Sequence, residues 1–487
     1  MKGFGELPQG WISVPLEVVG RWGSGGTPKK GNNIFYGGNI PWLKIGDLTD
    51  GPVYSAEESI TEIGLKQSSA KLLSENTVLL AMYGSIGKLG ITKIECATNQ
   101  AIAFCFHDEK LIELKYLFFG LLFLRQEFIA QGQGGTQQNI SQTILKQTKL
   151  PLAPLAEQKR IVDKIETLFS DLDKGESLLK QVQQQLAVYR QSVLKEAVTG
   201  ELTREWREQN KHRLESGEVL LQRILKLRRE NWKGRGKYQE PVASDTFGLS
   251  KMPDGWCYCN VEQLAYVETG ATPKKGNKLY YENGSIPWIT STAVNQDPIN
   301  DFQSLITEKA LRETNVKVFP KRTLILAMYG EGKTRGSVSE LNIEAGTNQA
   351  CAGLICEHLP YEIKCFLKLF LKYNYNLIRL ESSGGVQPNL NLGIVKKTIL
   401  PLPSTEEQNE IVDRINDIFS QIDALEKWCA TELARSGMLR QSILRAAFSG
   451  ELVPQDPEDE PASELLARIQ AERASAARDK FKPATVR

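Results

Sequence analysis

The sequence predicts a mixed α+β (α/β) fold in two copies, each copy ending in one long helix. Three observations lead to this. The hexapeptide TPKKGN at 27–32 returns at 272–277, and other motifs return in the same order at offsets of 245 to 250. Roughly the first 150 residues of each copy are rich in glycine, proline, aromatic and β-branched residues, which is typical of strands and turns. The stretch that follows has apolar residues at steps of three and four, as in a coiled coil.

The repeated motifs cover most of the chain. In chain order they are LPQGW (7–11) and MPDGW (252–256), GGTPKKGN and GATPKKGN, IPW (40–42 and 286–288), LAMYG (80–84 and 326–330), TNQA (98–101 and 347–350), GGTQQN (134–139) and GGVQPN (384–389), LPL (150–152 and 400–402), EQKRIV (157–162) and EQNEIV (407–412), and RQSVLKEAVTGEL (190–202) and RQSILRAAFSGEL (440–452). Such order and spacing indicate a duplicated unit of roughly 250 residues, far longer than a solenoid repeat.

These motifs divide the chain into six predicted segments. They are a first domain at 1–153, a first long helix at 154–202, a basic linker at 203–244, a second domain at 245–403, a second long helix at 404–452 and a C-terminal tail helix at 453–487. Within the domains, short apolar runs such as 77–84 and 101–106 predict strands. Residues 203–240 are interpreted as a short helix followed by a solvated run.

The apolar stripe of each long helix needs a partner, and the other copy's helix is the expected one. The predicted pairing residues are Ile161, Ile165, Leu168, Leu172, Leu179 and Leu186 in the first helix and Ile411, Ile415, Ile418 and Ile422 in the second, and the stripes continue through Tyr189, Leu425 and Leu439. Glu432 and Ser436 are expected to weaken the second stripe, and Ser404 with Glu407 predicts a capping box. The alternative is that each helix packs on its own domain.

Composition limits the class of protein. A chain of 487 residues is too long for one core, and 41% hydrophobic with 24% charged residues is typical of soluble globular proteins. The net charge of +2 means that a nucleic-acid binder would have to concentrate its basic groups locally or share them with a partner. Eight scattered cysteines without a CxxC pair, and three histidines, make a zinc site unexpected and favour reduced cytoplasmic thiols. The longest apolar run, at 114–124, is too short to span a bilayer and predicts a buried helix, so no membrane association is expected.

The sequence offers no motif of a catalytic centre. GSIGK (84–88) and GEGKT (330–334) resemble phosphate-binding loops, but neither satisfies the full pattern of a P-loop. A dinucleotide fingerprint, an amino-methylation motif, a Ser/His/Asp constellation and HExxH are all missing from the sequence. We therefore expect a chain that is not an enzyme by itself.

What recurs instead is a set of loop residues suited to DNA. Glycine-rich turns with lysine suit phosphates, while asparagine, glutamine and lysine can read base edges. The candidate DNA-binding residues are Thr27, Lys29, Lys30, Lys44, Tyr83, Ser85, Lys88, Gln137 and Asn139 in the first copy and Thr272, Lys274, Lys275, Tyr329, Lys333, Gln387 and Asn389 in the second. A role in turn structure or surface solubility is open for each, and above all for Asn99 and Asn348 of TNQA, which can cap a turn. Trp42 and Trp288 are predicted to be core residues.

Taken together, these motifs resemble the specificity subunit of Type I restriction–modification systems over nearly the whole length of the chain. The resemblance rests on the duplicated LPxGW start, the TPxK turn, IPW, GGTQQNIS and LPLAPLAEQKRIV, and the stretches TREWRE and LLARIQAERA resemble the enteric subgroup. It implies two target-recognition domains joined by two long antiparallel helices, each domain reading one half of a split site in double-stranded DNA. It also implies that the helices set the spacing and dock two methyltransferase subunits, to which endonuclease subunits add.

The resemblance further implies a cytoplasmic protein without a cofactor of its own. S-adenosylmethionine, ATP and magnesium would belong to the partner subunits. The shared turns are interpreted as holding phosphate and fold, and the unshared loops at 43–59 and 289–304 as choosing the bases. Two other classes stay open: a self-contained DNA methyltransferase or nuclease of divergent sequence, and a scaffold that does not bind DNA.

Overall fold

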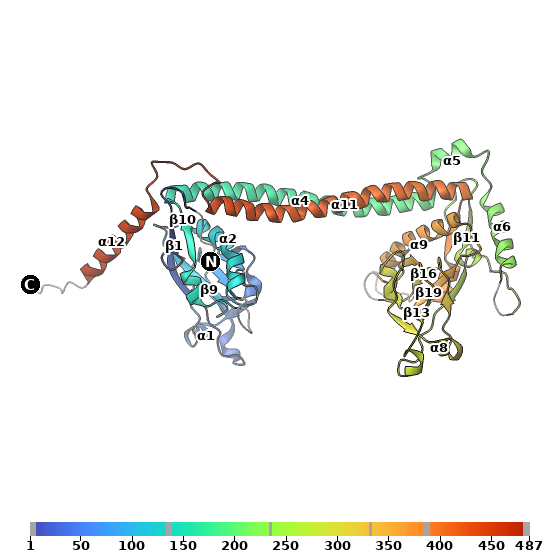
Figure 1. Cartoon of the computed structure of the whole chain (residues 1–487), viewed down its shortest axis with the longest axis horizontal. Helices are drawn as coiled ribbons and strands as arrows, with labels where there is room; N and C mark the ends of the chain where they lie inside the picture. The colour runs from blue at the N-terminus through green and yellow to red at the C-terminus, as the bar shows by residue number, and fades with distance from the viewer. Residues whose placement is uncertain (1–5, 133–138, 233–235, 331–333, 383–389, 481–487) are drawn as a thin grey trace, which may run out of the picture. The chain divides into compact units, whose positions relative to one another are not determined.

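The computed structural model describes residues 6–132, 139–232, 236–330, 334–382 and 390–480. The chain divides into two compact units, unit 1 with residues 1–180 and 430–487, and unit 2 with residues 181–429. Two helices, α4 (Leu155–Thr199) and α11 (Thr405–Phe448), contribute one end to each unit (Figure 1). Each unit is therefore built from segments of both repeats.

Unit 1 is a mixed α+β body. Besides its parts of α4 and α11 it contains β1 (Ile12–Pro15), β2 (Gly20–Ser24), η1 (Asn33–Phe35), β3 (Tyr36–Leu43), η2 (Ile45–Asp47), β4 (Gly51–Val53), β5 (Glu58–Ile60), α1 (Glu62–Lys66), β6 (Val78–Ala81), β7 (Leu89–Thr92), β8 (Ala97–Thr98), β9 (Ile102–His107), α2 (Leu114–Gly132), α3 (Gln142–Gln147), β10 (Lys149–Leu152) and α12 (Ala462–Lys480). Its sheets have the orders β2-β9-β6-β7-β4, β5-β3-β8 and β1-β10. The pairs β3–β8 and β4–β7 are parallel, and the others are antiparallel.

Unit 2 repeats this plan. It contains α5 (Arg204–Asn210), α6 (Gly217–Glu230), β11 (Cys257–Asn260), α7 (Val261–Leu264), β12 (Tyr266–Thr269), η3 (Lys278–Tyr280), β13 (Ile286–Ile289), η4 (Ser291–Asn295), β14 (Ser304–Ile306), α8 (Glu308–Glu313), β15 (Val318–Phe319), β16 (Leu324–Ala327), β17 (Val338–Glu340), β18 (Ala345–Thr347), β19 (Cys351–Ile355), α9 (Tyr361–Ser382), α10 (Leu392–Lys397) and β20 (Ile399–Leu402). The orders β12-β19-β16-β17, β14-β13-β18-β15 and β11-β20 match those of unit 1, with β15 as an addition and no described counterpart of β4. The predicted two-copy mixed fold is confirmed.

The central strands and the covering helices follow from the apolar runs. β6 and β16 are buried along their whole length, as expected for strands covered on both faces. The run at 114–124 lies in α2, which buries Tyr116 and Phe128 completely, so the predicted buried helix is confirmed. Gly120 lies in this helix because a Cβ there would come within 2.6 Å of Leu150 and 3.3 Å of Phe448 of α11. No described helix is both long and apolar enough to cross a membrane.

The ends of α4 and α11 pack on each other and on a domain at the same time. In unit 1, Ile161 and Ile165 share one core with Leu444 and Phe448. In unit 2, Ile411 and Ile415 share a core with residues 193–198 of α4. Pairing of the long helices with each other and packing of each helix on a domain were the two alternatives. Both occur, because each helix end is buried by the other helix and by a domain.

The middle of the helix pair is only partly buried. Ile422 is buried, whereas Leu168, Leu172, Leu179, Leu186 and Ile418 are half-buried. Tyr189, Leu425 and Leu439, expected on the stripes, are 50%, 46% and 42% exposed, so this part of the prediction is wrong. Ser436 was expected to weaken the stripe, but it is buried and its hydroxyl donates a hydrogen bond of 2.7 Å to Glu176. The pair is held there by polar contacts as well as by apolar ones.

An arginine clasp fixes the antiparallel register in each unit. In unit 1, Arg440 of α11 contacts Asp173 at 2.7 Å and Glu176 at 3.0 Å and lies 5.1 Å from the ring centre of Phe169. In unit 2 the equivalent Arg190 of α4 pairs with Asp423 and lies 4.5 Å from the ring centre of Phe419. Both clasps join a carboxylate, a guanidinium and an aromatic face, so they resist sliding of one helix along the other.

The start of each long helix is anchored by a tryptophan. The indole nitrogen of Trp11 donates to Glu157 at 2.9 Å, and that of Trp256 donates to Glu407 at 2.7 Å. The Glu407 amide donates to Ser404 at 3.2 Å, but the Glu407 side chain turns to Trp256. Only half of the predicted capping box forms, because the carboxylate serves a tertiary contact instead.

The segment after each long helix also docks on a domain. The amide of Gly217, at the start of α6, donates to Gly255 at 2.7 Å, and the amide of Ala462, at the start of α12, donates to Gly10 at 2.8 Å. Leu220 and Ile224 of α6 are buried, as are Leu465 and Ile469 of α12. The interpretation of residues 217–230 as part of a solvated run is therefore wrong, since an apolar face of α6 packs on unit 2.

The two anchoring carboxylates differ in their charge environment, and this predicts losses of different size when each is neutralised. Glu407 also pairs with buried Arg207 at 2.7 Å, so Glu407→Gln would leave a buried guanidinium without its partner. We expect a loss of about 3 kcal/mol of stability in unit 2. Glu157 is buried and its Oε1 atom has no hydrogen-bond partner among the described residues, so Glu157→Gln is expected to cost little.

The pH dependence separates the two variants further. Burial raises the pKa of Glu157, more than its hydrogen bond from Trp11 lowers it. A carboxyl group with a raised pKa contributes stability that is present at low pH and is lost as pH rises through the folded-state pKa. Relative to Glu157→Gln, the unmodified chain should therefore be more stable at pH 5 than at pH 8 in urea denaturation. If Glu157→Gln changed the free energy of unfolding by the same amount at pH 5 and pH 8, this account would be contradicted.

Candidate nucleic-acid interface

Three repeated motifs meet in each unit through the same hydrogen bonds. The Thr27 hydroxyl donates to the side chain of Gln100 in unit 1, and the Thr272 hydroxyl donates to Gln349 at 2.6 Å in unit 2. These contacts join the TPKKGN loop to the TNQA turn. The LAMYG turn adds to them, because the Met82 amide donates to Ala101 at 2.8 Å and the Met328 amide donates to Ala350 at 2.7 Å. We call residues 27–32, 82–88 and 99–101, with their equivalents 272–277, 328–330 and 348–350, the loop clusters.

Close backbone packing explains the glycines beside TPKKGN. A Cβ on Gly25 would lie 2.1 Å from the carbonyl oxygen of Thr98, and a Cβ on Gly270 would lie 2.1 Å from that of Thr347. No other residue allows this approach, so the glycines bring the loop against the TNQA turn.

Aromatic side chains of each domain donate hydrogen bonds to the backbone of the TPKKGN loop. The indole of Trp42 donates to the Gly26 carbonyl at 3.1 Å, and that of Trp288 donates to the Ala271 carbonyl at 3.2 Å. Both indoles are buried, which confirms their prediction as core residues. The Tyr36 hydroxyl donates to the Pro28 carbonyl at 2.7 Å, and Tyr281 donates equivalently to Pro273 at 2.6 Å. The loop is therefore positioned by the core in the same way in both units.

In the TNQA turn the asparagine caps the turn, as the sequence suggested, and the glutamine makes a contact that the sequence analysis did not anticipate. The Asn99 and Asn348 side chains accept hydrogen bonds from the amides of Ala101 and Ala350 at 3.1 and 3.2 Å, so they cap the turn. The exposed partners of the threonines are Gln100 and Gln349. The recurrence of Gln100 as Gln349, each directly after the capping asparagine, could have identified these glutamines from the sequence.

The candidate lysines fall into two groups. Lys29, Lys30, Lys274 and Lys275 are exposed on the TPKKGN loops, which leaves their ammonium groups accessible to a ligand. Lys44 instead pairs with Glu58 and lies 5.7 Å from the ring centre of Trp42. The ammonium group of Lys88 donates to the carbonyls of Ile45 and Gly46 at 3.3 and 3.4 Å. In this structure, therefore, Lys44 and Lys88 support the neighbouring loop.

The remaining candidates lie on the turn after β6 and β16. Tyr83 and Tyr329 are both 40% exposed, Ser85 is exposed, and Asn139 is exposed and forms a backbone bridge with Tyr83. This bridge brings Asn139 to the loop cluster of unit 1. Gln137, Lys333, Gln387 and Asn389 lie outside the described residues.

The loops that the repeats do not share adjoin the clusters. The Asn99 amide donates to Leu43 at 3.0 Å just before η2, and the Asn348 amide donates to Ile289 at 3.2 Å just before η4. In unit 1 this position presents charged groups, with Asp47 accepting from the Lys44 amide at 2.7 Å. In unit 2 it presents neutral ones: Thr290, which contacts Thr292 at 2.8 Å, and Gln303, which accepts from the Thr290 amide at 2.9 Å. The same frame therefore presents different polar groups in the two units.

Two properties of the described part of the chain bear on its chemistry, namely its capacity to hold a metal ion and the groups that the loop clusters expose to a ligand. No group of three or more histidine, cysteine, aspartate or glutamate side chains that could hold a metal ion occurs among the described residues. The cysteines are free, and burial raises the pKa of Cys105 and Cys351 to about 12, so these thiols stay protonated at neutral pH. The clusters offer exposed ammonium, amide and hydroxyl groups, which suit the phosphates and base edges of DNA.

Each unit combines a mixed α+β domain with the same hydrogen-bonded loop cluster. Residues 8–184 and 253–433 match the family described as the Type I restriction modification DNA specificity domain, and the chain belongs to this family. It is thus a specificity subunit of the Type I restriction–modification class.

Curated relatives agree with this assignment, and solved structures share the fold. The chain is 31% identical to the EcoBI specificity subunit of Escherichia coli over 71% of this chain and 70% of that one, and 26% identical to the EcoKI specificity subunit of E. coli strain K12 over 97% of each. Its fold is similar to a chain solved in a study of complex assembly and conformational transition of the type I R-M system, with a TM-score of 0.66, 19% identity and coverage of 92% and 100%. The HsdS subunit from Thermoanaerobacter tengcongensis gives a TM-score of 0.54 at 18% identity, with coverage of 92% and 99%.

The exposed loop lysines predict a sequence-independent contribution to DNA binding. Lys29→Ala and Lys275→Ala should each weaken binding to all duplex sequences alike, because each would remove one phosphate contact. The slope of log affinity against log salt should fall by about 0.9 for each variant. Lys174→Ala, which removes an equally exposed lysine of α4, is the matched control and should leave the slope unchanged. A variant that altered sequence preference with an intact slope would show that the lysine reads a base.

Proposed function

We propose that this chain is the DNA-reading subunit of a Type I restriction–modification complex and that each loop cluster reads one half of a bipartite site. The observation that carries the proposal is the recurrence of the same hydrogen-bonded cluster in both units, joined to different neighbouring loops. Identical frames suit the phosphates, which are alike in every sequence. Different neighbouring loops suit the bases, which differ between half-sites.

The residues beside each cluster suggest how the half-sites would be chosen. Unit 1 offers the carboxylates of Asp47 and Glu58, which can accept from cytosine, with Lys44 ion-paired to Glu58 beside them. Unit 2 offers the hydroxyls of Thr290 and Thr292 and the amide of Gln303, which can both donate and accept. The two half-sites are therefore expected to differ in sequence.

The reaction itself would belong to other subunits. The sequence contains no catalytic motif, which supports a role in recognition without chemistry. S-adenosylmethionine would then bind a methyltransferase partner, and ATP and magnesium would bind an endonuclease partner. Incubating the purified chain with DNA, S-adenosylmethionine and magnesium separates this proposal from a self-contained enzyme. Methyl transfer or cleavage by the chain alone would contradict it, and the absence of salt-dependent DNA binding would favour a scaffold.

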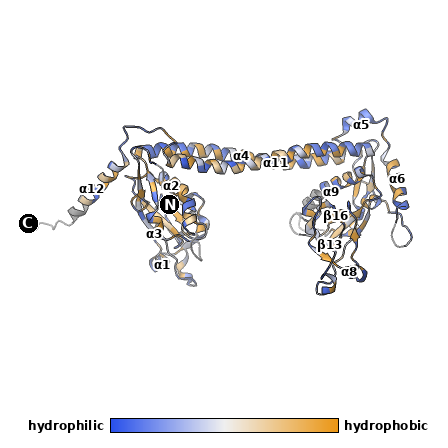
Figure 2. Cartoon of the chain, in the orientation of Figure 1, coloured by the Kyte–Doolittle hydropathy of each residue, from blue (hydrophilic) through white to orange (hydrophobic). Residues whose placement is uncertain are grey.

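Exposed apolar residues on the long helices support two docking positions for a methyltransferase. In unit 1, Leu178 of α4 and Met438 of α11 are 62% and 65% exposed, and in unit 2 their equivalents Trp428 and Val188 are 53% and 71% exposed. The clasps place the members of each pair at the same level of the helix pair, because Glu176 contacts residues 436 and 440 and Arg190 contacts residues 423 and 426. Figure 2 shows apolar residues among the polar ones along α4 and α11. Two equivalent patches fit two copies of one partner, and endonuclease subunits would join through them.

Removing one patch should change the stoichiometry of the complex. We expect Trp428→Ser to leave one methyltransferase bound per chain instead of two, because only the patch of unit 2 loses its large apolar residue. Phe247→Ser, at a residue that is 96% exposed and belongs to neither long helix, is the control and should retain two. Analytical ultracentrifugation of the purified complexes gives the ratio. Two methyltransferases on the Trp428→Ser chain would place the docking surface elsewhere.

The helix pair is proposed to set the distance between half-sites. Four residues lengthen a helix by about 6 Å and turn it by only some 40° beyond whole turns, and one base pair advances about 3.4 Å. Insertion of four residues at 180–187 of α4 together with four at 429–433 of α11 should preserve both clasps. It should widen the gap between half-sites by about one or two base pairs.

Insertion into α4 alone is the informative control. One helix would then be longer than the other between the clasps of Glu176 and Arg190, so both clasps could not form in register. We expect this variant to lose methylation. Methylome sequencing of a host carrying each variant with its neighbouring methyltransferase reports motif and gap together. An unchanged gap with activity retained in the doubly extended variant would show that the helices do not set the spacing.

A further inference from the structure

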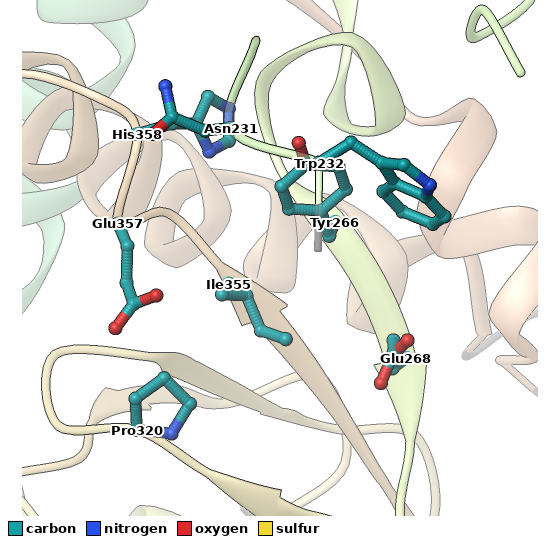
Figure 3. Close-up of a pocket in the computed structure, with 8 residues that line it drawn as sticks. All are labelled: Asn231, Trp232, Tyr266, Glu268, Pro320, Ile355, Glu357 and His358. Atoms are coloured by element: carbon teal, nitrogen blue, oxygen red, sulfur yellow. The ribbon is translucent and has the colours of Figure 1, made fainter. Parts of the chain in front are cut away.

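A cavity of about 420 Å³ opens in unit 2 between the end of α6 and the edge of the β12–β19 sheet. Its lining includes Trp232, Tyr266, Glu268, Ile355, Glu357 and His358. In Figure 3 the rings of Trp232 and Tyr266 form one wall, Ile355 lies next to Tyr266, its partner in the β12–β19 pair, and the carboxylates of Glu357 and Glu268 lie on opposite sides. The cavity thus combines aromatic surface with negative charge, away from the loop cluster.

The aromatic wall is a packed and uncharged surface. The ring centres of Trp232 and Tyr266 are 5.4 Å apart, and those of Tyr266 and His358 are 5.0 Å apart. Burial and the nearby Arg228 lower the pKa of His358 to about 4, so its imidazole is neutral at physiological pH. Glu268 pairs with Lys317 at 2.8 Å, which leaves Glu357 as the carboxylate available at this cavity.

The repeat provides an equivalent place in unit 1. Arg21 lies opposite Phe106 in the β2–β9 pair, as Tyr266 lies opposite Ile355 in the β12–β19 pair. Asp108 occupies the position of Glu357, and Arg473 of α12 the position of Arg228 of α6, by the alignment of the repeats. The two helices dock alike, so these positions can be compared directly.

Unit 1 pairs its own guanidinium with the carboxylate at this place, although a cavity of about 620 Å³ opens there too, whereas unit 2 leaves its carboxylate unpaired among the described residues. Arg473 pairs with Asp108, and Arg21 lies 5.7 Å from the ring centre of Phe106. In unit 2, Arg228 lies 4.0 Å from the ring centre of Tyr266, and its Nε and Nη1 atoms have no hydrogen-bond partner among the described residues. Glu357 is exposed and has neither an ion pair nor a hydrogen bond within the part of the chain that the structure describes.

We propose that the cavity of unit 2 binds an arginine side chain of a protein partner. Its aliphatic part would lie on Ile355 and the aromatic wall, and its guanidinium would pair with Glu357, as Arg473 pairs with Asp108 in unit 1. A planar guanidinium stacks on aromatic faces and pairs with a carboxylate through two parallel hydrogen bonds. The unpaired carboxylate of Glu357 repels a phosphate, so it favours a cationic partner over nucleic acid at this place.

Fluorine NMR of the full chain labelled with 5-fluorotryptophan tests the proposal. The Trp232 resonance is assigned with Trp232→Phe, and the probe is N-acetyl-arginine amide. We expect a saturable shift of this resonance with a Kd on the order of 1 mM, as befits a single side chain. N-acetyl-citrulline amide, which has the same shape without the charge, should bind at least tenfold more weakly.

Two substitutions assign the binding to this cavity. Glu357→Gln should weaken the response to the arginine probe at least tenfold while the spectrum of the free chain keeps its dispersion. Glu357→Lys, which brings a cation of the chain itself to the cavity, should abolish the response. Asp108→Asn, the matched change in unit 1, should leave it unaltered.

Three outcomes would overturn the proposal. A citrulline probe that binds as well as arginine would show that charge is not recognised. Spermidine binding more tightly than the arginine probe would assign the cavity to an ammonium ligand instead of a guanidinium. A response that survives in Glu357→Gln and Glu357→Lys would place the binding elsewhere on the chain.

Discussion

A buried carboxylate at the start of each long helix holds the architecture together. Glu157 and Glu407 accept from the indoles of Trp11 and Trp256, which directly precede the first strand of each repeat. That strand pairs with the strand leading into the helix, β1 with β10 and β11 with β20. The indole contact therefore fixes the corner at which the chain leaves the domain. The direction of the helix relative to its domain, and with it the proposed spacing of half-sites, depends on this contact together with the packing of the helix end in the domain core.

At the start of α11, residues of the first repeat add contacts to the corner formed by Trp256 and Glu407. Arg207 and Thr203, which follow α4, reach Glu407 at 2.7 Å each, so the end of one repeat completes the corner of the other. In unit 1 the tail after α11 docks instead, with Arg160 pairing with Asp459 at 2.7 Å. Each compact unit thus contains a domain from one repeat and a helix end from both. The duplication is an exchange of segments, so neither repeat contains all the segments of one compact unit.

The sequence predicted features that depend on neighbouring or periodic residues, and it did not predict contacts between distant parts of the chain. The motifs located the loops, and the apolar period located both helices, because these signals lie in neighbouring residues. The period could not separate a facing residue from an outward one, and Leu425 and Leu439 turned out to be exposed. The clasps of Arg190 and Arg440 were also beyond reach, since a pairing across more than 200 residues leaves no pattern in either helix. α6 could have been found from Ser216, whose side chain caps it, and from the apolar spacing of Leu220 and Ile224.

The way the variable loops are attached explains how one frame can accommodate different recognition surfaces. The segments before η2 and η4 hydrogen-bond through backbone atoms to the turn that Asn99 and Asn348 cap, and this link needs no particular side chain in the loop. The frame beneath is held by buried indoles and by glycines that tolerate no Cβ. A substitution at an exposed position of the loop therefore changes the presented groups without disturbing a core contact, whereas one in the frame would disturb both. For this reason the two repeats can agree in their turns and differ in the loops between them, which fits the proposed reading of two unlike half-sites.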